Sequence, residues 1–371
     1  MTLPRLLQTV LLSLGVAGCQ GHNPYADPAL RHRAPEGFRN NYTDAVPGTA
    51  LDLLRWKWNA WREGLPPAPG QATPVVSPDL TAIRANATAG PAMQPAVTWI
   101  GHATTLVQAG GLNVLTDPMF SERASPVQWA GPKRAQPPGV ALADLPAIDV
   151  VLISHNHYDH LDVASVKALD ARARGATVFL VPLGLKPWFK DIGIENVVEL
   201  DWWQSRQVGG VRFHLTPVQH WSARGVGDRR QTLWGGWAAF SPDFHWYFSG
   251  DTGYSPDFKD TRAHFMAEEA NGGGFDLALI AVGAYKPEWF MHGQHVTPAE
   301  AVAIHRDLGA RRSMGVHWGT FTLTDEPLDQ PPADLAAARR AQQVQDDAFF
   351  VLAIGETRRF PPRAATPPPA P

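Results

Sequence analysis

The sequence predicts an α/β fold in which strands and helices pack as a layered sandwich. Short β-rich runs alternate with helical patterns over residues 96–360, and no repeat of fixed period is visible. The chain of 371 residues with 44% hydrophobic content can bury a sizeable core. Proline-rich stretches adjoin this region on both sides, so we expect one large domain at 96–360 with accessory segments at its ends.

The predicted domain begins with a series of strands. Residues 97–118, VTWIGHATTLVQAGGLNVLTDP, indicate two strands, a Gly-Gly turn at 110–111 and a third strand. The apolar run at 149–154 predicts a buried strand. A helical pattern at 163–173 and a further strand at 177–182 follow it.

The second half of the domain continues with the same two kinds of element. Strands are predicted at 197–200, 211–218, 235–241, 245–250, 276–283 and 313–318. A helix is predicted at 297–309, where Thr297 can cap the first turn and Pro298 fits the position after the cap. Strands and helices are therefore mixed throughout, as in an α/β sandwich.

Residues 1–18 have the pattern of a lipoprotein-type signal peptide. Arg5 precedes a mostly apolar run at 6–16, which is too short to span a bilayer permanently, and small residues lead to Cys19. This pattern resembles the lipobox of bacterial lipoproteins, in which the cysteine is lipidated; an ordinary secretory signal with a chance cysteine is the alternative. We expect export and a membrane anchor at Cys19, with Gln20 favouring the outer membrane.

Residues 19–95 are interpreted as a tether and wrapping arm, because their prolines and glycines interrupt regular structure. Within them, LLRWKWNAW predicts a short helix with Leu54, Trp58 and Trp61 on one face. This face could rest on a membrane surface or dock the arm onto the main domain, and docking is the expectation. Residues 361–371 contain six prolines and should be disordered or polyproline-like.

Charge and cysteine content exclude two classes of site. The formal net charge of −3 and the pI near 6.5 give no basic surplus that would hold nucleic acid. One cysteine cannot form an intramolecular disulfide or a cysteine-rich zinc site. Any metal ligands must therefore come from histidine, aspartate and glutamate.

A cluster of such ligands follows the predicted strand at 149–154. His155, His157, Asp159 and His160 form the pattern H-x-H-x-D-H, and a turn can aim alternate side chains at one point while the adjacent pair serves a second. Two zinc ions, each with about three protein ligands and an open position, need roughly six or seven ligands. This loop supplies four of them.

Three further candidates lie at predicted strand ends: His220, Asp251 and His317. Each alone is more often a satisfied polar group, but together with the cluster they complete a set of seven. We expect two zinc ions with Asp251 bridging them. The first would be held by His155, His157 and His220, and the second by Asp159, His160 and His317.

This constellation resembles the metallo-β-lactamase superfamily, whose fold is an αββα sandwich with a dinuclear site at one edge. No cysteine lies near the site, which departs from the β-lactamases that use a cysteine ligand, and a bridging Asp251 is similar to the phosphodiesterase and thioesterase branches. Over about residues 95–325 the chain also resembles the N-acylphosphatidylethanolamine-hydrolysing phospholipase D family. The strings that carry this resemblance are WIGHATTLVQ, LTDPMFSERASPVQWAGPKR, SHNHYDHLD, PVQHWSAR, FSGDTGY, AYKPEWFMHGQHVTPAEAV and VHWGTF.

The resemblance implies a dinuclear zinc phospholipase D that releases an N-acylethanolamine and phosphatidic acid from a membrane phospholipid. The seven metal ligands carry over, and Gln294 and His295 match substrate-binding positions beside the metals. His295 would orient the phosphate or protonate the leaving alkoxide, with a purely structural role as the alternative. The lipoprotein-like N-terminus and the segment 291–293 depart from the family, which leaves the substrate open.

A phosphodiester suits the charge of the predicted centre. Two Zn²⁺ ions, opposed by Asp159, Asp251 and a bridging hydroxide, leave about one positive charge to attract a phosphate. Zinc lowers the pKa of bound water to about 7, so that hydroxide can attack near neutral pH without a covalent intermediate. Two alternatives remain. The enzyme could hydrolyse another phosphodiester or a lactone, or the chain could be a non-catalytic envelope protein that binds metal or lipid.

Several other residues carry separate expectations. Asp117 and Asp162 are interpreted as carboxylates that orient ligand histidines. His102 lies on a predicted turn between strands and could approach the site, but a structural role is the expectation. A group of aromatic residues could line a groove for acyl chains, but core packing is the expectation. The group consists of Trp202, Trp203, Trp221, Trp234, Trp237, Trp289 and Phe290.

Overall fold

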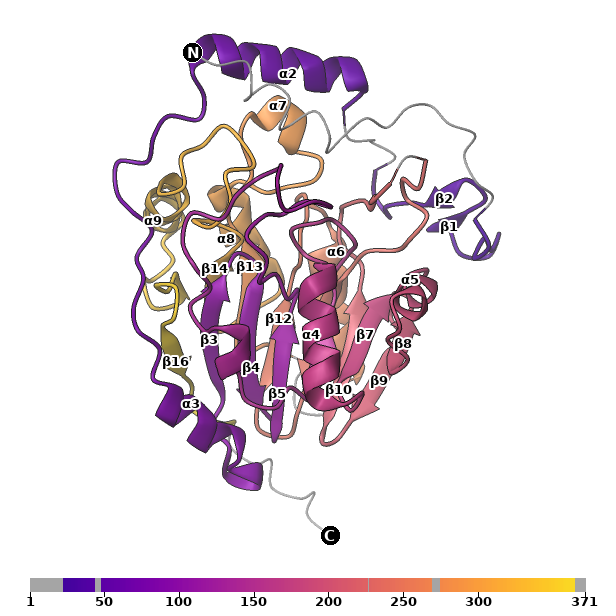
Figure 1. Ribbon diagram of the computed structural model, residues 1–371, viewed down its shortest axis with the longest axis vertical. Helices are drawn as coiled ribbons and strands as arrows, with labels where there is room; N and C mark the ends of the chain where they lie inside the picture. Colours follow the sequence, from indigo (N-terminus) through magenta and orange to yellow (C-terminus); the bar gives the residue numbers. More distant parts are fainter. Residues whose placement is uncertain (1–22, 44–47, 226, 269–273, 364–371) are drawn as a thin grey trace.

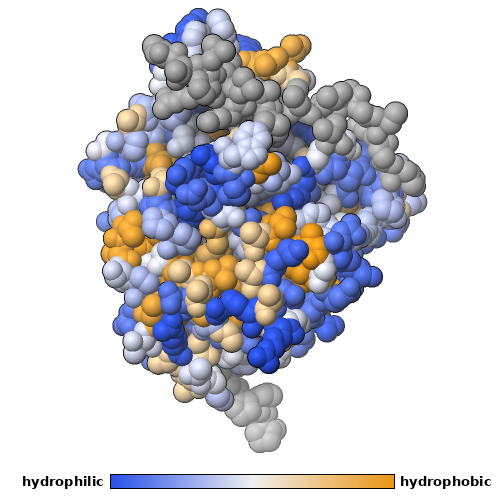
Figure 2. All heavy atoms as spheres, in the orientation of Figure 1, coloured by the Kyte–Doolittle hydropathy of each residue, from blue (hydrophilic) through white to orange (hydrophobic). Residues whose placement is uncertain are grey.

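The computed structural model describes residues 23–43, 48–225, 227–268 and 274–363. The predicted signal peptide, the predicted lipidation at Cys19 and most of the proline-rich tail lie outside the described residues. Hydrophilic and hydrophobic residues are interspersed over the face of the molecule in Figure 2.

Two mixed sheets form the centre of the molecule (Figure 1). The first contains β3 (Ala96–Gly101), β4 (Thr104–Ala109), β5 (Leu112–Thr116), β6 (Val150–Leu152), β7 (Val178–Pro182), β8 (Val197–Leu200) and β16 (Thr357–Arg359). The second contains β9 (Ser205–Val208), β10 (Val211–Thr216), β11 (Gly236–Phe240), β12 (His245–Phe248), β13 (Leu277–Ala281), β14 (Ser313–Val316) and β15 (Phe349–Phe350). A separate short pair is formed by β1 (Arg33–Ala34) and β2 (Gly37–Phe38).

The two sheets are built alike. Their orders are β16-β3-β4-β5-β6-β7-β8 and β15-β14-β13-β12-β11-β10-β9. In the first sheet the strands from β16 to β5 pair antiparallel and those from β5 to β8 pair parallel. In the second sheet the strands from β9 to β12 pair antiparallel and those from β12 to β15 pair parallel. Parallel strands need crossover connections. Helices supply them for every parallel pair except β5 and β6, whose long connection contains only a 3₁₀ turn.

Helices cover the outer faces of the sheets. On the first sheet lie α3 (Leu80–Ala87), α4 (Val163–Ala173) and α5 (Lys186–Asp191), which share an apolar cluster with its strands. On the second lie α6 (Asp257–Glu268), α8 (Pro298–Asp307) and α9 (Gln330–Gln342). Short 3₁₀ turns occur at Gly90–Ala92 and Leu142–Asp144. Figure 1 shows α2 (Ala50–Glu63) and α7 (Glu288–Met291) at one end of the molecule.

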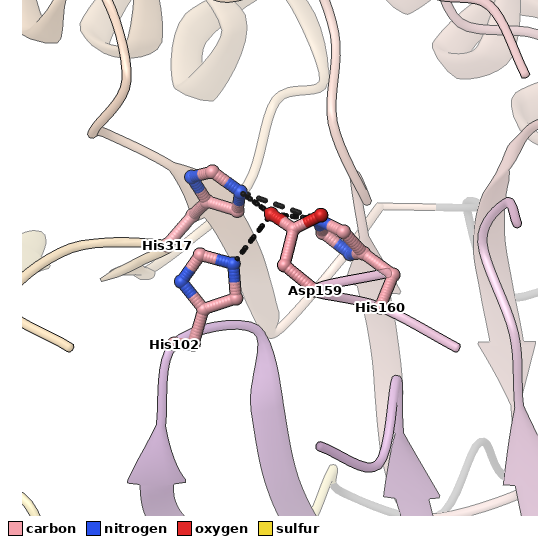
Figure 3. Close-up of side chains that lie close together, drawn as sticks. All are labelled: His102, Asp159, His160 and His317. Atoms are coloured by element: carbon pink, nitrogen blue, oxygen red, sulfur yellow. Dashed lines mark hydrogen bonds and ion pairs between the residues drawn. The ribbon is translucent and has the colours of Figure 1, made fainter. Parts of the chain in front are cut away.

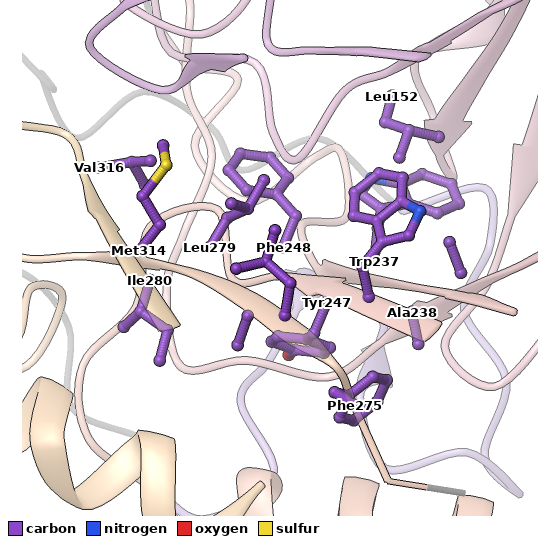
Figure 4. Close-up of a cluster of buried hydrophobic side chains, with 14 of the residues drawn as sticks. Leu152, Trp237, Ala238, Tyr247, Phe248, Phe275, Leu279, Ile280, Met314 and Val316 are labelled. Carbon is purple, nitrogen blue, oxygen red and sulfur yellow. The ribbon is translucent and has the colours of Figure 1, made fainter. Parts of the chain in front are cut away.

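The main core fills the space between the sheets. Leu152 of the first sheet and Trp237, Phe248 and Leu279 of the second belong to one cluster of fully buried side chains (Figure 4). Strands buried on both faces read as continuous apolar runs, which is why the sequence predicts them readily. The architecture confirms the predicted αββα sandwich.

Local sequence signals account for the elements that were predicted at the right place. The predicted helix 163–173 is α4, and the turn at 110–111 has positive φ at both glycines. At α8, Thr297 Oγ1 accepts a hydrogen bond from the Glu300 amide, and the Glu300 carboxylate accepts one from the Thr297 amide. This capping box begins α8 at Pro298.

The expectation that Trp58 and Trp61 dock the arm onto the main domain is wrong. Both side chains are exposed on α2, and the docking residue is Trp56, whose indole Nε1 donates to Asp325 Oδ2 at 2.7 Å. A Thr49–Asp52 capping box begins this helix and Gly64, with φ of 69°, ends it. Among the described helices, none is long and apolar enough to cross a membrane.

Candidate metal centre

The H-x-H-x-D-H loop follows the carboxyl end of β6. Its fold is compact, because the amides of His160 and Leu161 both donate to the carbonyl of His157. Arg224 holds the loop from outside, with Nη1 donating to the carbonyl oxygens of Asn156 and Leu161 at 2.9 and 2.6 Å. Arg224 was not predicted, although it lies within the PVQHWSAR string.

Three histidines form the first group of converging ring nitrogens. Nδ1 of His157 lies 2.8 Å from Nε2 of His155 and 3.3 Å from Nε2 of His220. His220 follows β10 in the second sheet, so the two sheets meet at this group. Ring nitrogens this close repel one another unless a proton or a cation lies between them.

Asp159, His160 and His317 form a second group (Figure 3). Oδ2 of Asp159 lies 3.4 Å from Nε2 of His160 and 3.4 Å from Nε2 of His317, and the two ring nitrogens are 3.2 Å apart. His317 follows β14, directly at the carboxyl end of that strand. The second group therefore also joins the two sheets.

Asp251 lies between the two groups. Its Oδ2 is 3.0 Å from Nε2 of His160 and 3.9 Å from Nε2 of both His155 and His220. Its Oδ1 is 3.1 Å from Nε2 of His317. One carboxylate thus lies close to ligand atoms of the second group and within 3.9 Å of those of the first.

The spacing of these atoms fits metal coordination. A tetrahedral zinc ion with Zn–N bonds of 2.0–2.1 Å places its ligand atoms about 3.3 Å apart. The contacts within the two groups span 2.8–3.4 Å. The seven side chains are buried, except that those of His157 and Asp159 are slightly exposed. The cluster is a metal-ion site by its donor set.

Outer hydrogen bonds fix the orientation of three rings. Nδ1 of His160 lies 2.7 Å from Asp117 Oδ2, and Nδ1 of His155 lies 2.9 Å from Ser154 Oγ. Nδ1 of His220 donates to the carbonyl of Gln294 at 2.9 Å. Such bonds leave Nε2 of each ring as the inward-facing atom. Asp117 orients a ligand histidine, as expected.

The expectation for Asp162 is wrong. Its carboxylate accepts hydrogen bonds from the amide of Ser165 at 3.2 Å and from Ser121 Oγ at 2.8 Å. Asp162 is the N-cap of α4, where an acceptor satisfies amides that have no partner within the helix. Its position two residues after the ligand loop is also the position at which α4 begins, so the same sequence fits both interpretations.

His102 belongs to the site, against the expectation that it is merely structural. Nε2 of His102 lies 3.0 Å from Asp159 Oδ2 (Figure 3). It occupies the turn between β3 and β4 with φ of 54°, and its carbonyl accepts from the amide of His317 at 3.0 Å. The available signal was its place at the end of a strand that runs in the same direction as β5 and β6.

The arm contributes a further unpredicted residue, Asn40. Its side-chain Nδ2 donates to the carbonyl of His220 at 3.0 Å, and its Oδ1 accepts from the amide of His220 at 3.0 Å. Both backbone groups of a candidate ligand are thereby held by one side chain. No local pattern in the sequence marks Asn40, because its partner lies 180 residues away.

Gln294 and His295 stand beside the cluster. Both amides donate to the carbonyl of Met291, the last residue of α7. The Gln294 side chain accepts from Trp221 Nε1 at 2.5 Å. Nδ1 of His295 lies 3.9 Å from Asp251 Oδ2. The resemblance therefore named two residues that the structure places at the edge of the cluster.

Burial sets the charge state of the first group. It lowers the pKa of His155 and His220 well below the usual value and lowers that of His157 to about 4. The three rings are therefore neutral near pH 7, which is the form that coordinates a metal.

Charge pairing sets the state of the second group. Burial would lower the pKa of His160, but Asp251 and Asp159 raise it well above the usual value, and Asp251 in the same way raises that of His317 to about 9. Burial would raise the pKa of both aspartates, but His160 holds them well below the usual value. Two carboxylates are thus ionised in a buried site that balances them with positive charge.

The aromatic residues divide into two sets. Trp202, Trp234 and Trp237 are buried, which confirms core packing for them. The ring of Trp221 lies 4.5 Å from that of His157, and Trp289 is exposed on α7. Core packing is therefore wrong for Trp289.

Comparisons with known proteins agree with this geometry. Residues 112–318 match the beta-lactamase superfamily domain. An N-acyl-phosphatidylethanolamine-hydrolyzing phospholipase D 1 from Caenorhabditis elegans is 40% identical over 270 residues, which cover 70% of this chain and 74% of that protein. The mitochondrial N-acyl-phosphatidylethanolamine-hydrolyzing phospholipase D of Saccharomyces cerevisiae is 36% identical over 246 residues, 64% of this chain and 50% of that protein.

A solved structure shares the fold. An isothiocyanate hydrolase from Delia radicum gut bacteria superposes with a TM-score of 0.56 at 20% identity, covering 72% of this chain and 99% of that one. The chain therefore belongs to the metallo-β-lactamase superfamily and is a metal-dependent hydrolase related to the N-acylphosphatidylethanolamine-hydrolysing phospholipases D.

Proposed function

We propose that the protein is a dinuclear zinc phospholipase D that hydrolyses N-acylphosphatidylethanolamine to an N-acylethanolamine and phosphatidic acid. The observation that carries the proposal is the position of Asp251. Its Oδ2 lies 3.0 Å from Nε2 of His160 in the second group and 3.9 Å from Nε2 of His155 and His220 in the first group. The similarity to two phospholipases with this named substrate supports the substrate class. The ligands are assigned to two ions as His155, His157 and His220, and Asp159, His160 and His317, with Asp251 shared.

The side chains supply a site that suits an anionic phosphodiester. Two zinc ions held there would lower the pKa of water to about 7 and offset the negative charge of the phosphate. Asp159 and Asp251 bring only two negative charges, and the three histidines of the first group are neutral. A substrate phosphate therefore meets a site of net positive charge once the cations are bound.

His295 acts as a hydrogen-bond donor to the substrate phosphate. Burial lowers its pKa to about 4, so the ring is neutral near pH 7 and carries one N–H. A neutral imidazole holds an oxygen in place, but it is a poor acid for a leaving alkoxide. Of the two roles considered for His295, orientation of the phosphate is thus the one assigned here. Gln294 fixes His220 through its carbonyl.

The reaction cleaves one phosphorus–oxygen bond. The oxygen of water forms a bond to phosphorus, and the bond between phosphorus and the ethanolamine oxygen breaks with its electron pair leaving on that oxygen. The leaving alkoxide then takes a proton from solvent. Metal ions and ordered donors can stabilise the attacking and leaving oxygens of such an in-line displacement.

Hydrolysis in ¹⁸O-labelled water tests this assignment. The zinc-loaded protein should place ¹⁸O in phosphatidic acid and none in the N-acylethanolamine, as measured by mass spectrometry. Asp251→Asn should be inactive, whereas Asp260→Asn, which changes an exposed carboxylate on α6, should match the unmodified chain. Label in a released fatty acid, or turnover of a lactone or another phosphodiester without turnover of this lipid, would contradict the proposed reaction.

We propose further that the protein is exported and anchored to the outer membrane through a lipidated Cys19. The sequence pattern at residues 5–20 supports this address. In a bacterial host, Cys19→Ala should release the protein from the membrane fraction or leave its precursor uncleaved. Unchanged partitioning and processing of that variant would contradict lipidation at Cys19.

A further inference from the structure

Helix α2 carries two apolar stripes, of which the first packs on the domain. Leu53, Trp56 and Ala60 are buried and form a cluster with Met291 of α7. The ring of Trp56 lies 5.0 Å from that of Phe290, and its indole donates to Asp325. These contacts hold α2 firmly, so its opposite face has a fixed position on the molecule.

The second stripe is exposed. Leu51, Leu54, Trp58 and Trp61 follow one another at spacings of three, four and three residues, and they are 76, 56, 58 and 53% exposed. At about 100° per residue this stripe lies on the side of α2 opposite the buried one. The exposed Trp289 of α7 extends it, because the guanidinium of Arg55 lies 5.2 Å above the Trp289 ring.

Charges are distributed unevenly around this stripe. At about 100° per residue, Arg55 and Arg62 project beside the exposed stripe, whereas Asp52 and Glu63 lie further round the helix. Both arginines are exposed. Leucine and tryptophan flanked by arginine is the arrangement by which amphipathic helices lie in the headgroup region of anionic membranes.

The exposed stripe is connected to the substrate-binding residues through one short element. The buried stripe of α2 contacts Met291, and the carbonyl of Met291 accepts the amides of Gln294 and His295. Figure 1 shows α2 and α7 at the same end of the molecule. A bilayer in contact with α2 would therefore lie at the end of the molecule that carries α7, whose last residue, Met291, is hydrogen-bonded to Gln294 and His295.

We propose that the exposed stripe of α2, extended by Trp289, is an interfacial surface that binds lipid bilayers containing anionic headgroups. A second copy of the chain fits this face less well. The helix of 14 residues is about 21 Å long, so one face of it offers much less than the roughly 800 Å² per partner of a stable interface. Binding at this surface is separate from the lipid anchor and from the proposed reaction.

A single fluorescent label tests the insertion of α2. Cys19 is the only cysteine of the chain, so the full chain with Cys19→Ser and Leu54→Cys takes one environment-sensitive dye on α2. The probe is a vesicle of phosphatidylcholine and phosphatidylglycerol with brominated acyl chains, which contains no N-acylphosphatidylethanolamine. We expect quenching of at least about twofold at position 54. The matched label at Met266→Cys, exposed on α6, should not respond.

Two results would overturn the proposal. One is a label at position 54 that does not respond although the protein sediments with the vesicles. The other is a response that follows protein concentration without vesicles, which would assign the stripe to a second copy of the chain. Because these vesicles hold no substrate, failure of the proposed reaction would leave the measurement unchanged.

Tryptophan removal provides an independent measure of affinity. In the same Cys19→Ser background, Trp58→Ala with Trp61→Ala should weaken vesicle partitioning on the order of tenfold. Met266→Ala with Val163→Ala removes exposed apolar surface from α6 and α4 and should leave partitioning unchanged. All variants should keep nearly the same melting temperature, since these side chains belong to none of the apolar clusters among the described residues. Equal loss of partitioning in both double variants would also contradict the proposal.

Discussion

Asp251 contacts His317 with one carboxylate oxygen, at 3.1 Å, while its other oxygen lies 3.0 Å from His160 and faces the remaining histidines. Asp251 therefore lies near ligand atoms of both groups, whereas the contacts of Asp159 within these groups are with His160 and His317 of the second group. Removal of Asp251 and removal of Asp159 should therefore have different consequences for metal binding.

His102 should position Asp159 for metal binding. With His102→Ala, the carboxylate loses the imidazole 3.0 Å from its Oδ2 and becomes free to rotate. We expect affinity for the second metal ion to fall by about 10–100-fold while the first ion stays bound. Zinc content after competition with a chelator measures this. His305→Ala also removes a buried histidine, which contacts Ser313 rather than the cluster, and should keep both ions. Equal zinc retention in the two variants would show that His102 has no positioning role.

Asn40 should couple the arm to the metal centre. Asn40→Ala breaks both hydrogen bonds to the backbone of His220, which leaves buried polar groups unsatisfied at a cost of about 1–3 kcal/mol. The free energy of unfolding should fall by that amount, and zinc should restore less of it than in the unmodified chain. Denaturant unfolding with and without zinc checks this.

The neighbouring residue supplies the control. Asn41 donates to Asp257 on α6 and contacts no ligand, so Asn41→Ala should not change the stabilisation by zinc. If the two variants gained the same stability from zinc, Asn40 would be a packing residue only.

The arm should detach in acid. Burial raises the pKa of Asp201, but hydrogen bonds and charge from His32 and Arg33 outweigh it and hold the pKa below its usual value. The ionised Asp201 carboxylate therefore stabilises the docked arm above about pH 4. This stabilisation is lost as the pH falls through the pKa that Asp201 has in the folded protein. Hydrogen exchange at Arg33 and Ala34, corrected for the intrinsic rate, should therefore be constant above about pH 4 and rise below it.

Asp201→Asn should remove this pH dependence. The charge-assisted contacts with Arg33, at 2.9 and 2.6 Å, are worth about 1.5–3 kcal/mol, so exchange in the arm should be about ten- to a hundredfold faster at neutral pH. An arm whose exchange in the unmodified chain did not respond to acid would contradict this account of its docking.

The features predicted best are those that depend on residues close together in the sequence. The pattern from His155 to His160 occupies one loop, and the strands around it are continuous apolar runs. The roles of His102 and Asn40 at the site were not predicted, because each residue contacts its partner only after the sheets assemble. The position of Asp162 in the sequence is compatible with two roles, orienting a metal ligand and capping a helix. The neighbouring residues do not distinguish between these roles. The same holds for α2, whose two apolar stripes are distinguished by the contacts that Trp56 makes with Met291 and Asp325 in the folded domain.

Metal content and turnover measured on the same samples of Asp251→Asn and His317→Ala test the dinuclear assignment. Asp251→Asn removes a charge that both groups share, so occupancy of both ions should fall and hydrolysis should be lost. His317→Ala removes one ligand from the second group, so it should retain about one zinc ion per chain, with activity reduced at least about 10–100-fold. An Asp251→Asn protein that kept two zinc ions and near-normal turnover would contradict the bridging role of Asp251 and, with it, the dinuclear centre.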